Sequence, residues 1–337
     1  MFNKSYEKLK QFIKKSYLWL LLYITLVATM LYPLPYYIYT GGGIIDISDK
    51  VEVRDGSNSK GSFNMCYVSE INATIPTYIM SYIFNSWDIV SKEEMSLSNK
   101  ETRTDILIRD QISLLKANQN AVITAYNNAN IPYTLTDRHN YIIYIADVSD
   151  TDLKIGDELL RINDIDVTTI DNVTSILNNK TVGDKVDVTV KSNGKIIDKY
   201  ATVWEENNRK LLGISFETIY DYDTSQKIEF NFTNNESGPS GGLMLSLFIY
   251  DKLIDDDITK GLKISGTGTI SEDGTVGEIG GVKYKLKGAV KAKSDVFLVP
   301  NGDNYEEAIK EQNKYNYKIK IIGVSTFKEA VEKLKEM

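Results

Sequence analysis

The sequence predicts an α+β protein of several domains. The chain has 337 residues, which at about 150 residues per domain is enough for two or three domains. Its first 40 residues join a basic start to a long uncharged stretch. Beyond them, a β-rich pattern over residues 141–203 gives way after residue 206 to alternating strand and helix signals.

The amino terminus has the composition of a membrane-spanning segment. Residues 1–15 contain a single acidic residue, Glu7, and five lysines: Lys4, Lys8, Lys10, Lys14 and Lys15. No charge follows from Tyr17 to Tyr39, which is long enough to cross a bilayer, and Pro33 and Pro35 should end or kink the helix. We expect a cytoplasmic basic segment at 1–15, a transmembrane helix at 16–40 and the rest of the chain outside the cytoplasm. A cleaved signal peptide is the alternative, although no clear small-x-small cleavage site follows.

Composition excludes several kinds of site. The net charge of −7 argues against nucleic acid as the main partner. The lone cysteine, Cys66, rules out an intramolecular disulfide framework and a cysteine-based zinc site. The lone histidine, His139, excludes a histidine-rich metal centre. The sequence therefore predicts neither a metal nor another cofactor.

Residues 41–137 are predicted to form an α+β membrane-proximal region. Short strands are expected at residues 44–47, 51–53 and 63–68, and a proline-free helix at 101–129. This region suggests no chemistry.

Residues 138–205 resemble a PDZ domain of the kind found in bacterial proteases. The resemblance rests on a strand at 141–145, the motif Leu153-Lys154-Ile155-Gly156-Asp157, a helix near 169–178 and the segment Val182-Gly183-Asp184. It implies a groove that binds an extended peptide by strand addition. We place that groove at Tyr141, Ile142 and Ile143, preceded by a loop at 137–140. His139 is expected to be an ordinary loop residue.

A glycine-rich serine motif marks the carboxyl-terminal domain, residues 206–337. Gly238-Pro239-Ser240-Gly241-Gly242 precedes an apolar helix, and a serine there has free backbone amides nearby. Such a serine is also the ordinary N-cap of a helix, and both readings stand at this point. A buried lysine with a lowered pKa can activate a serine without histidine.

The serine motif and a second motif around Lys283 together resemble the proteolytic domain of Lon proteases. The second motif is Thr267-Gly268-Thr269-Ile270 followed by Gly280-Gly281-Val282-Lys283, and Lys283 lies 43 residues after Ser240. The resemblance implies Ser240 as nucleophile, Lys283 as general base and Thr267 as a support for the lysine. The loop residues Gly238, Pro239 and Gly241 would shape the oxyanion site. Lys285 and Lys287 are expected to be solvated surface lysines.

Taken together, the segments resemble the membrane-anchored PDZ-Lon serine proteases of the YlbL-like family. The resemblance implies a serine endopeptidase that cleaves envelope, membrane-associated or unfolded proteins with help from the PDZ domain. It implies hydrolysis without ATP, since the sequence has no G-x-x-x-x-G-K-[ST] phosphate loop. A homo-oligomer is left open. Two rivals remain: a catalytically inactive PDZ scaffold, and a Ser-His protease that uses His139.

Overall fold

The computed structural model describes residues 2–84 and 86–337 and divides into two compact units. One unit contains residues 1–41 and 69–95, and the other contains 42–68 and 96–337. Strands β1 (Pro33–Asp46) and β3 (Ser62–Thr74) each contribute to both units. Met1, and the side chains of Lys4 and Lys8 in the predicted basic segment, lie outside the described residues.

The first unit begins with the long helix α1 (Phe2–Leu31), which ends just before Pro33 as expected. Its segment Lys10–Leu31 is long and apolar enough to cross a membrane, as either an anchor or a signal sequence. The predicted span to residue 40 is too long, because β1 begins at Pro33 and pairs with β4 (Asp88–Ser91). An extended segment with a strand partner cannot continue the helix. The unit is completed by α2 (Ile75–Ile83) and α3 (Lys92–Met95).

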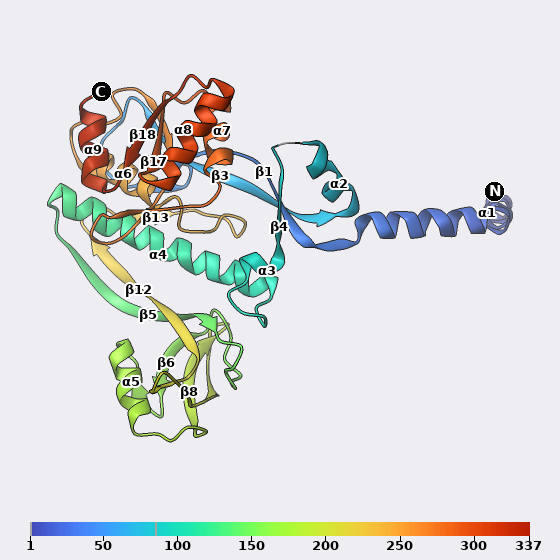
Figure 1. The fold of residues 1–337 in the computed structure, drawn as a ribbon, viewed down its shortest axis with the longest axis horizontal. Helices are drawn as coiled ribbons and strands as arrows, with labels where there is room; N and C mark the ends of the chain where they lie inside the picture. Colours follow the sequence, from blue (N-terminus) through green and yellow to red (C-terminus); the bar gives the residue numbers. More distant parts are fainter. Residues whose placement is uncertain (1, 85) are drawn as a thin grey trace. The chain divides into compact units, whose positions relative to one another are not determined.

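The core of the second unit is a sheet with helices on both faces (Figure 1). Its parallel strands run in the order β18 (Lys320–Val324), β17 (Val296–Pro300), β14 (Lys263–Gly266) and β3, with β1 beside β3. Side chains alternate between the faces, so that Leu298 packs in one cluster and Phe297 in the other. The first cluster is covered by α4 (Arg103–Ala129), α6 (Gly242–Leu253) and α9 (Phe327–Lys335), and the second by α7 (Val282–Lys291) and α8 (Asp303–Tyr315).

The predicted region 41–137 is not a separate layer. In β3, Phe63 pairs with Ile264 of the carboxyl-terminal domain, and α4 packs against α6. Strand β3 contributes buried side chains to the cores on both faces of the sheet, since Phe63 lies in the first cluster and Cys66 in the second. A strand apolar on both faces needs cover on both, which the carboxyl-terminal helices provide.

The PDZ-like module is larger than residues 138–205. Its sheet runs β12 (Ile214–Thr224), β5 (Tyr133–Ile145), β6 (Glu158–Ile162), β8 (Lys185–Ser192) and β9 (Lys195–Thr202), with α5 (Ile170–Asn178) packed on it. The expected boundary at residue 206 is therefore wrong, because β12 closes this sheet. Residues 137–140 are also not a loop, since they lie within β5 and pair with β12.

Four short strand pairs complete the second unit. They are β7 (Ile165–Asp166) with β6, β10 (Trp204–Glu206) with β11 (Arg209–Leu211), β2 (Val51–Val53) with β13 (Ile228–Phe230), and β15 (Thr269–Ile270) with β16 (Val276–Gly277). A 3₁₀ turn spans Ile47–Asp49.

Candidate active site

The loop before α6 is held in a tight turn by backbone contacts. Gly238 has φ +91, a conformation that favours glycine, and its amide donates to the carbonyl of Asp110 at 2.9 Å. The carbonyl of Ser240 accepts hydrogen bonds from the Gly268 amide at 2.8 Å and the Thr267 hydroxyl at 3.0 Å. These contacts fix the main chain of Ser240 at the start of α6.

Ser240 is not the N-cap of α6. That position belongs to Gly241, which makes no side-chain cap, and the Ser240 hydroxyl has no hydrogen-bond partner among the described residues. The amides of Gly242 and Leu243 are occupied by the carbonyls of Pro239 and Gly268. In the described part of the chain the amides of Ser240 and Gly241 have no such partner, which leaves them available to an oxyanion. Gly238 and Pro239 shape the loop but offer no free donor.

Lys285 lies on the inner face of α7 and is 4% exposed. Val282, Leu286 and Ala289 form the apolar stripe by which α7 packs on the sheet, and Lys285 falls among them. Its Nζ donates to the Thr267 hydroxyl at 3.1 Å. Burial lowers the pKa of Lys285 from 10.5 to about 8. A lysine of this kind is partly neutral near neutral pH and can accept a proton.

Lys283 does not occupy this position. It is half-buried; its amide donates to Glu307 at 3.4 Å, and its Nζ lies 5.0 Å from the centroid of the Tyr284 ring. Residues two apart on a helix point in nearly opposite directions, so only one of the two lysines can face the sheet. The structure brings Lys285 to Thr267, and the expectation that Lys285 is a solvated surface lysine is wrong. Lys287 is exposed, as predicted.

Thr267 connects the nucleophile loop to Lys285. Its side chain is fully buried at the end of β14, where its amide donates to the carbonyl of Leu298 at 3.0 Å. Because its hydroxyl donates to the Ser240 carbonyl, a lone pair is left to accept from Lys285. Ser240, Thr267 and Lys285 are thereby held as one group.

The sequence reasoning missed Cys66 as a neighbour of this group. Cys66 belongs to β3 and is buried beside α7. Burial raises the pKa of its thiol to about 12, so the group stays neutral and supplies no negative charge to Lys285. The sequence does not indicate the contact between Cys66 and α7, because it places Cys66 and Lys285 in different predicted domains.

His139 and Glu236 serve other parts of the fold. His139 lies on β5, where its Nδ1 is 2.7 Å from Glu158, so the structure does not bring it to Ser240. Glu236, the acidic residue nearest the serine motif, forms an ion pair with Lys50 at 2.9 Å. Neither residue activates the serine in this arrangement.

The peptide groove expected at Tyr141, Ile142 and Ile143 is also misplaced. Strand β5 lies between β12 and β6, and Ile142 is fully buried. The two edges of the sheet are β12 and β9, and the later residues of β12 bond to side chains of α4. A groove of 920 Å³ runs between the first residues of β12, α5 and the β10–β11 hairpin. The buried indole N–H of Trp204, which borders this groove, has no hydrogen-bond partner among the described residues.

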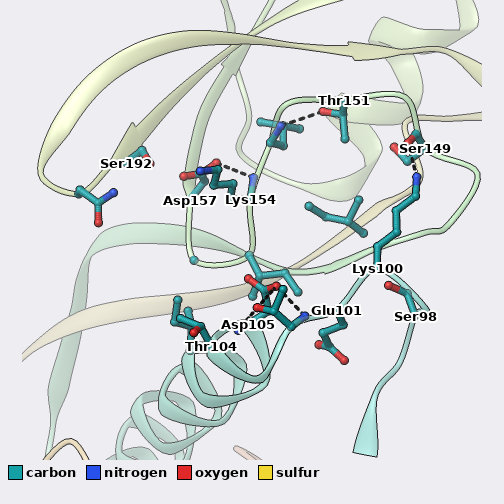
Figure 2. Close-up of a pocket in the computed structure, with 17 residues that line it drawn as sticks. Ser98, Lys100, Glu101, Thr104, Asp105, Ser149, Thr151, Lys154, Asp157 and Ser192 are labelled. Carbon is teal, nitrogen blue, oxygen red and sulfur yellow. Dashed lines mark hydrogen bonds between the residues drawn. The ribbon is translucent and has the colours of Figure 1, made fainter. Parts of the chain in front are cut away.

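A second cavity, of 680 Å³, separates the start of α4 from the PDZ-like module (Figure 2). Several of its polar side chains are engaged locally: Asp157 accepts from the Lys154 amide at 2.8 Å, and Lys100 donates to the carbonyl of Ser149 at 3.3 Å. Asp105 forms the capping box of α4 with Thr102. This cavity lies where α4 packs against the module.

Gly156 permits the close approach of this module to α4. It has φ +91, and a Cβ there would lie 2.7 Å from Cγ2 of Ile108 on α4. We expect Gly156→Ala to lower the free energy of unfolding by several kcal/mol, more than the roughly 1–2 kcal/mol expected for backbone strain alone. Gly183→Ala is the matched control, because its φ is +93 and nothing lies within 4 Å of the added methyl. Equal losses in urea unfolding would show that contact with Ile108 does not matter.

Comparison with known proteins identifies the domain that carries Ser240, Thr267 and Lys285. Residues 231–336 match the family model of the Lon protease (S16) C-terminal proteolytic domain. The carboxyl-terminal domain, which carries all three residues, is therefore similar to the Lon-type proteolytic domain, as the sequence indicated.

The comparisons with curated proteins and with solved structures differ in their results. No curated protein is significantly similar to the chain. Among solved structures, the PDZ domain of the SdrC-like protein from Listeria monocytogenes is 19% identical, with a TM-score of 0.22. The alignment covers 25% of this chain and 92% of that one.

Proposed function

We propose that the chain is a serine endopeptidase that uses Ser240 as nucleophile and Lys285 as general base. One observation carries the proposal: inside the Lon-type domain, a buried lysine of lowered pKa is joined through the Thr267 hydroxyl to the main chain of Ser240. The inactive scaffold has no comparable support, because such a lysine is costly to bury without a use.

In the proposed reaction, neutral Lys285 takes the hydroxyl proton as Ser240 attacks the peptide carbonyl. The amides of Ser240 and Gly241 stabilise the oxyanion. Lys285 then delivers the proton to the leaving amine, and water hydrolyses the acyl-enzyme through the same groups. No step requires ATP or a metal ion.

The pH dependence of peptide hydrolysis tests this proposal. Only the neutral form of Lys285 can act as base, and burial lowers its pKa to about 8. We expect kcat/KM to rise with pH through a midpoint near 8 and to fall about tenfold per unit well below it. A profile governed by a group near pH 10.5, the ordinary lysine value, would contradict the role of a buried lysine.

We infer that the PDZ-like groove captures substrate proteins. An extended segment would add to the edge of β12 beside Ile214 and Phe216, where the groove lies. Tethering a substrate in this way raises its local concentration to about the mM range.

Two neighbouring residues of α5 separate groove binding from other effects. Thr174 lines the groove and Ser175, also exposed, does not. We expect Thr174→Arg to slow cleavage of a full-length protein substrate severalfold while leaving a short unstructured peptide unaffected. Ser175→Arg should change neither rate. If the two variants cleave the protein substrate equally well, delivery through this groove is refuted.

We propose that α1 anchors the protein in the cytoplasmic membrane as a single span. The basic segment favours an amino terminus in the cytoplasm, which would place the proteolytic domain outside. The substrates would then be envelope or membrane-associated proteins.

A further inference from the structure

The first unit carries an apolar surface that no part of the described chain covers. It lies on α2 and the residues just after it. Ile79 is 56% exposed, Tyr82 is 70% exposed and Ile83 is 68% exposed, with Met80 and Phe84 also exposed. Contiguous apolar surface of this kind marks a contact with another protein or with a membrane.

Helix α2 buries a polar side chain and exposes large apolar ones, which is the reverse of the pattern on a helix that faces water. Its buried residue is the small polar Ser81, whose hydroxyl donates to the carbonyl of Tyr78. The large apolar side chains point outward. The sequence around the helix, from Ile71 to Trp87, contains no charged residue. A protein surface in contact with water would need charged or polar groups there.

The position of α2 indicates what covers this surface. Helix α2 contacts α1, and the Tyr36 ring, just beyond the end of α1, lies 5.3 Å from the Tyr78 ring. Figure 1 shows α2 beside the carboxyl-terminal end of α1. If α1 crosses the bilayer, α2 lies at the membrane–water interface on the outer side of that bilayer, where tyrosine and tryptophan are favoured. Tyr78, Tyr82 and Trp87 supply such side chains.

We propose that α2 is a second membrane contact, lying in the outer interface with Ile79, Tyr82 and Ile83 among the lipids. The partner is the bilayer itself. A helix that lies in the interface buries its apolar face about 5–10 Å into the headgroup–acyl boundary. Two contacts, the spanning helix α1 and the surface helix α2, would fix the orientation of the first unit against the membrane. This inference rests on the proposed membrane anchor.

Depth-dependent quenching of a fluorophore tests the contact in the full-length protein. Ile83→Cys, Leu22→Cys and Ile196→Cys are each labelled with a polarity-sensitive dye and reconstituted in phospholipid vesicles. Ile196, on β9 in the other unit, is 66% exposed and is the matched control for Ile83. The native Cys66 is buried, and the unmodified protein measures any label it takes up.

We expect the dye at Ile83 to lose fluorescence mainly to lipids that carry a spin label high in the acyl chain. At Leu22, within α1, a label deep in the chain should quench more, and at Ile196 only aqueous iodide should quench. Quenching of Ile83 by iodide alone would overturn the proposal. Protection from both iodide and spin-labelled lipid would also overturn it and assign the surface to a protein partner or a second copy. Absence of lipid quenching at Leu22 would instead refute the anchor.

Discussion

Lys285→Met is expected to abolish peptide hydrolysis and, at pH 7, to stabilise the fold. Methionine keeps the length and apolar stem of the side chain but cannot accept a proton. Loss of a general base lowers kcat by about 10²–10⁴-fold. Lys283→Met removes an identical charge two residues away on the other side of α7 and should leave hydrolysis within about twofold of the wild type.

The stability change follows from the same lysine. The pKa of Lys285 is about 8 in the folded protein and 10.5 for an ordinary lysine, so the unfolded chain binds one more proton than the folded protein between these pH values. Wild-type stability therefore rises as pH increases from 8 to 10.5, and below pH 8 the buried charge costs about 3 kcal/mol. At pH 7, Lys285→Met should therefore have a higher free energy of unfolding than the wild type. Above pH 10.5 this difference should disappear. Urea unfolding at pH 7 and pH 10.5 measures both points.

Two results would contradict the account of Lys285. An inactive Lys283→Met with an active Lys285→Met would restore the original assignment of the base. A Lys285→Met protein that is destabilised equally at both pH values would show that the lysine contributes packing alone.

Ser240→Ala is expected to reduce hydrolysis by several orders of magnitude without unfolding the domain. The hydroxyl makes no hydrogen bond within the described chain, so its loss leaves no buried group unpaired. Members of one catalytic unit are non-additive, and Ser240→Ala/Lys285→Met should be little worse than either single variant. Hydrolysis of an unstructured peptide measures all three.

The double variant also separates the protease from the rival scaffold. Multiplicative losses would mean that Ser240 and Lys285 act independently, which the proposed mechanism does not allow. Full activity in Ser240→Ala would exclude this serine as the nucleophile.

The elements with strong local signals were predictable from the sequence. Pro33 ended α1, and the helix expected near 169–178 is α5. The last helix, α9, also begins at a local signal, because the Thr326 side chain accepts from the Glu329 amide at 3.1 Å. Each depends on residues close together in the chain.

The errors in the domain boundaries and in the groove concern contacts between distant segments. Strand β3 pairs with β14 about 200 residues later, and nothing in the sequence of β3 indicates which strand it pairs with. Strand β12 lies beyond the expected domain boundary and pairs with β5 at one edge of the PDZ-like sheet. The groove therefore lies beside β12 and not beside β5. Here tertiary pairing decided which edge is free.

The choice of lysine was an error that the sequence could have prevented. Spacing from Ser240 favoured Lys283, but the apolar residues Val282, Leu286 and Ala289 define the inner face of α7. Lys285 lies on that face and Lys283 does not. Helical periodicity within the motif was a better guide to the buried lysine than the count of residues between two motifs.

The most direct test of the proposed active site is a crystal structure of the protein with a peptide boronic acid, which mimics the tetrahedral intermediate. The account predicts a covalent bond from Ser240 Oγ to boron, one boronate oxygen on the amides of Ser240 and Gly241, and Lys285 Nζ within hydrogen-bond distance of Ser240 Oγ. Boron on another residue, or Lys283 Nζ in place of Lys285 Nζ beside Ser240, would contradict it.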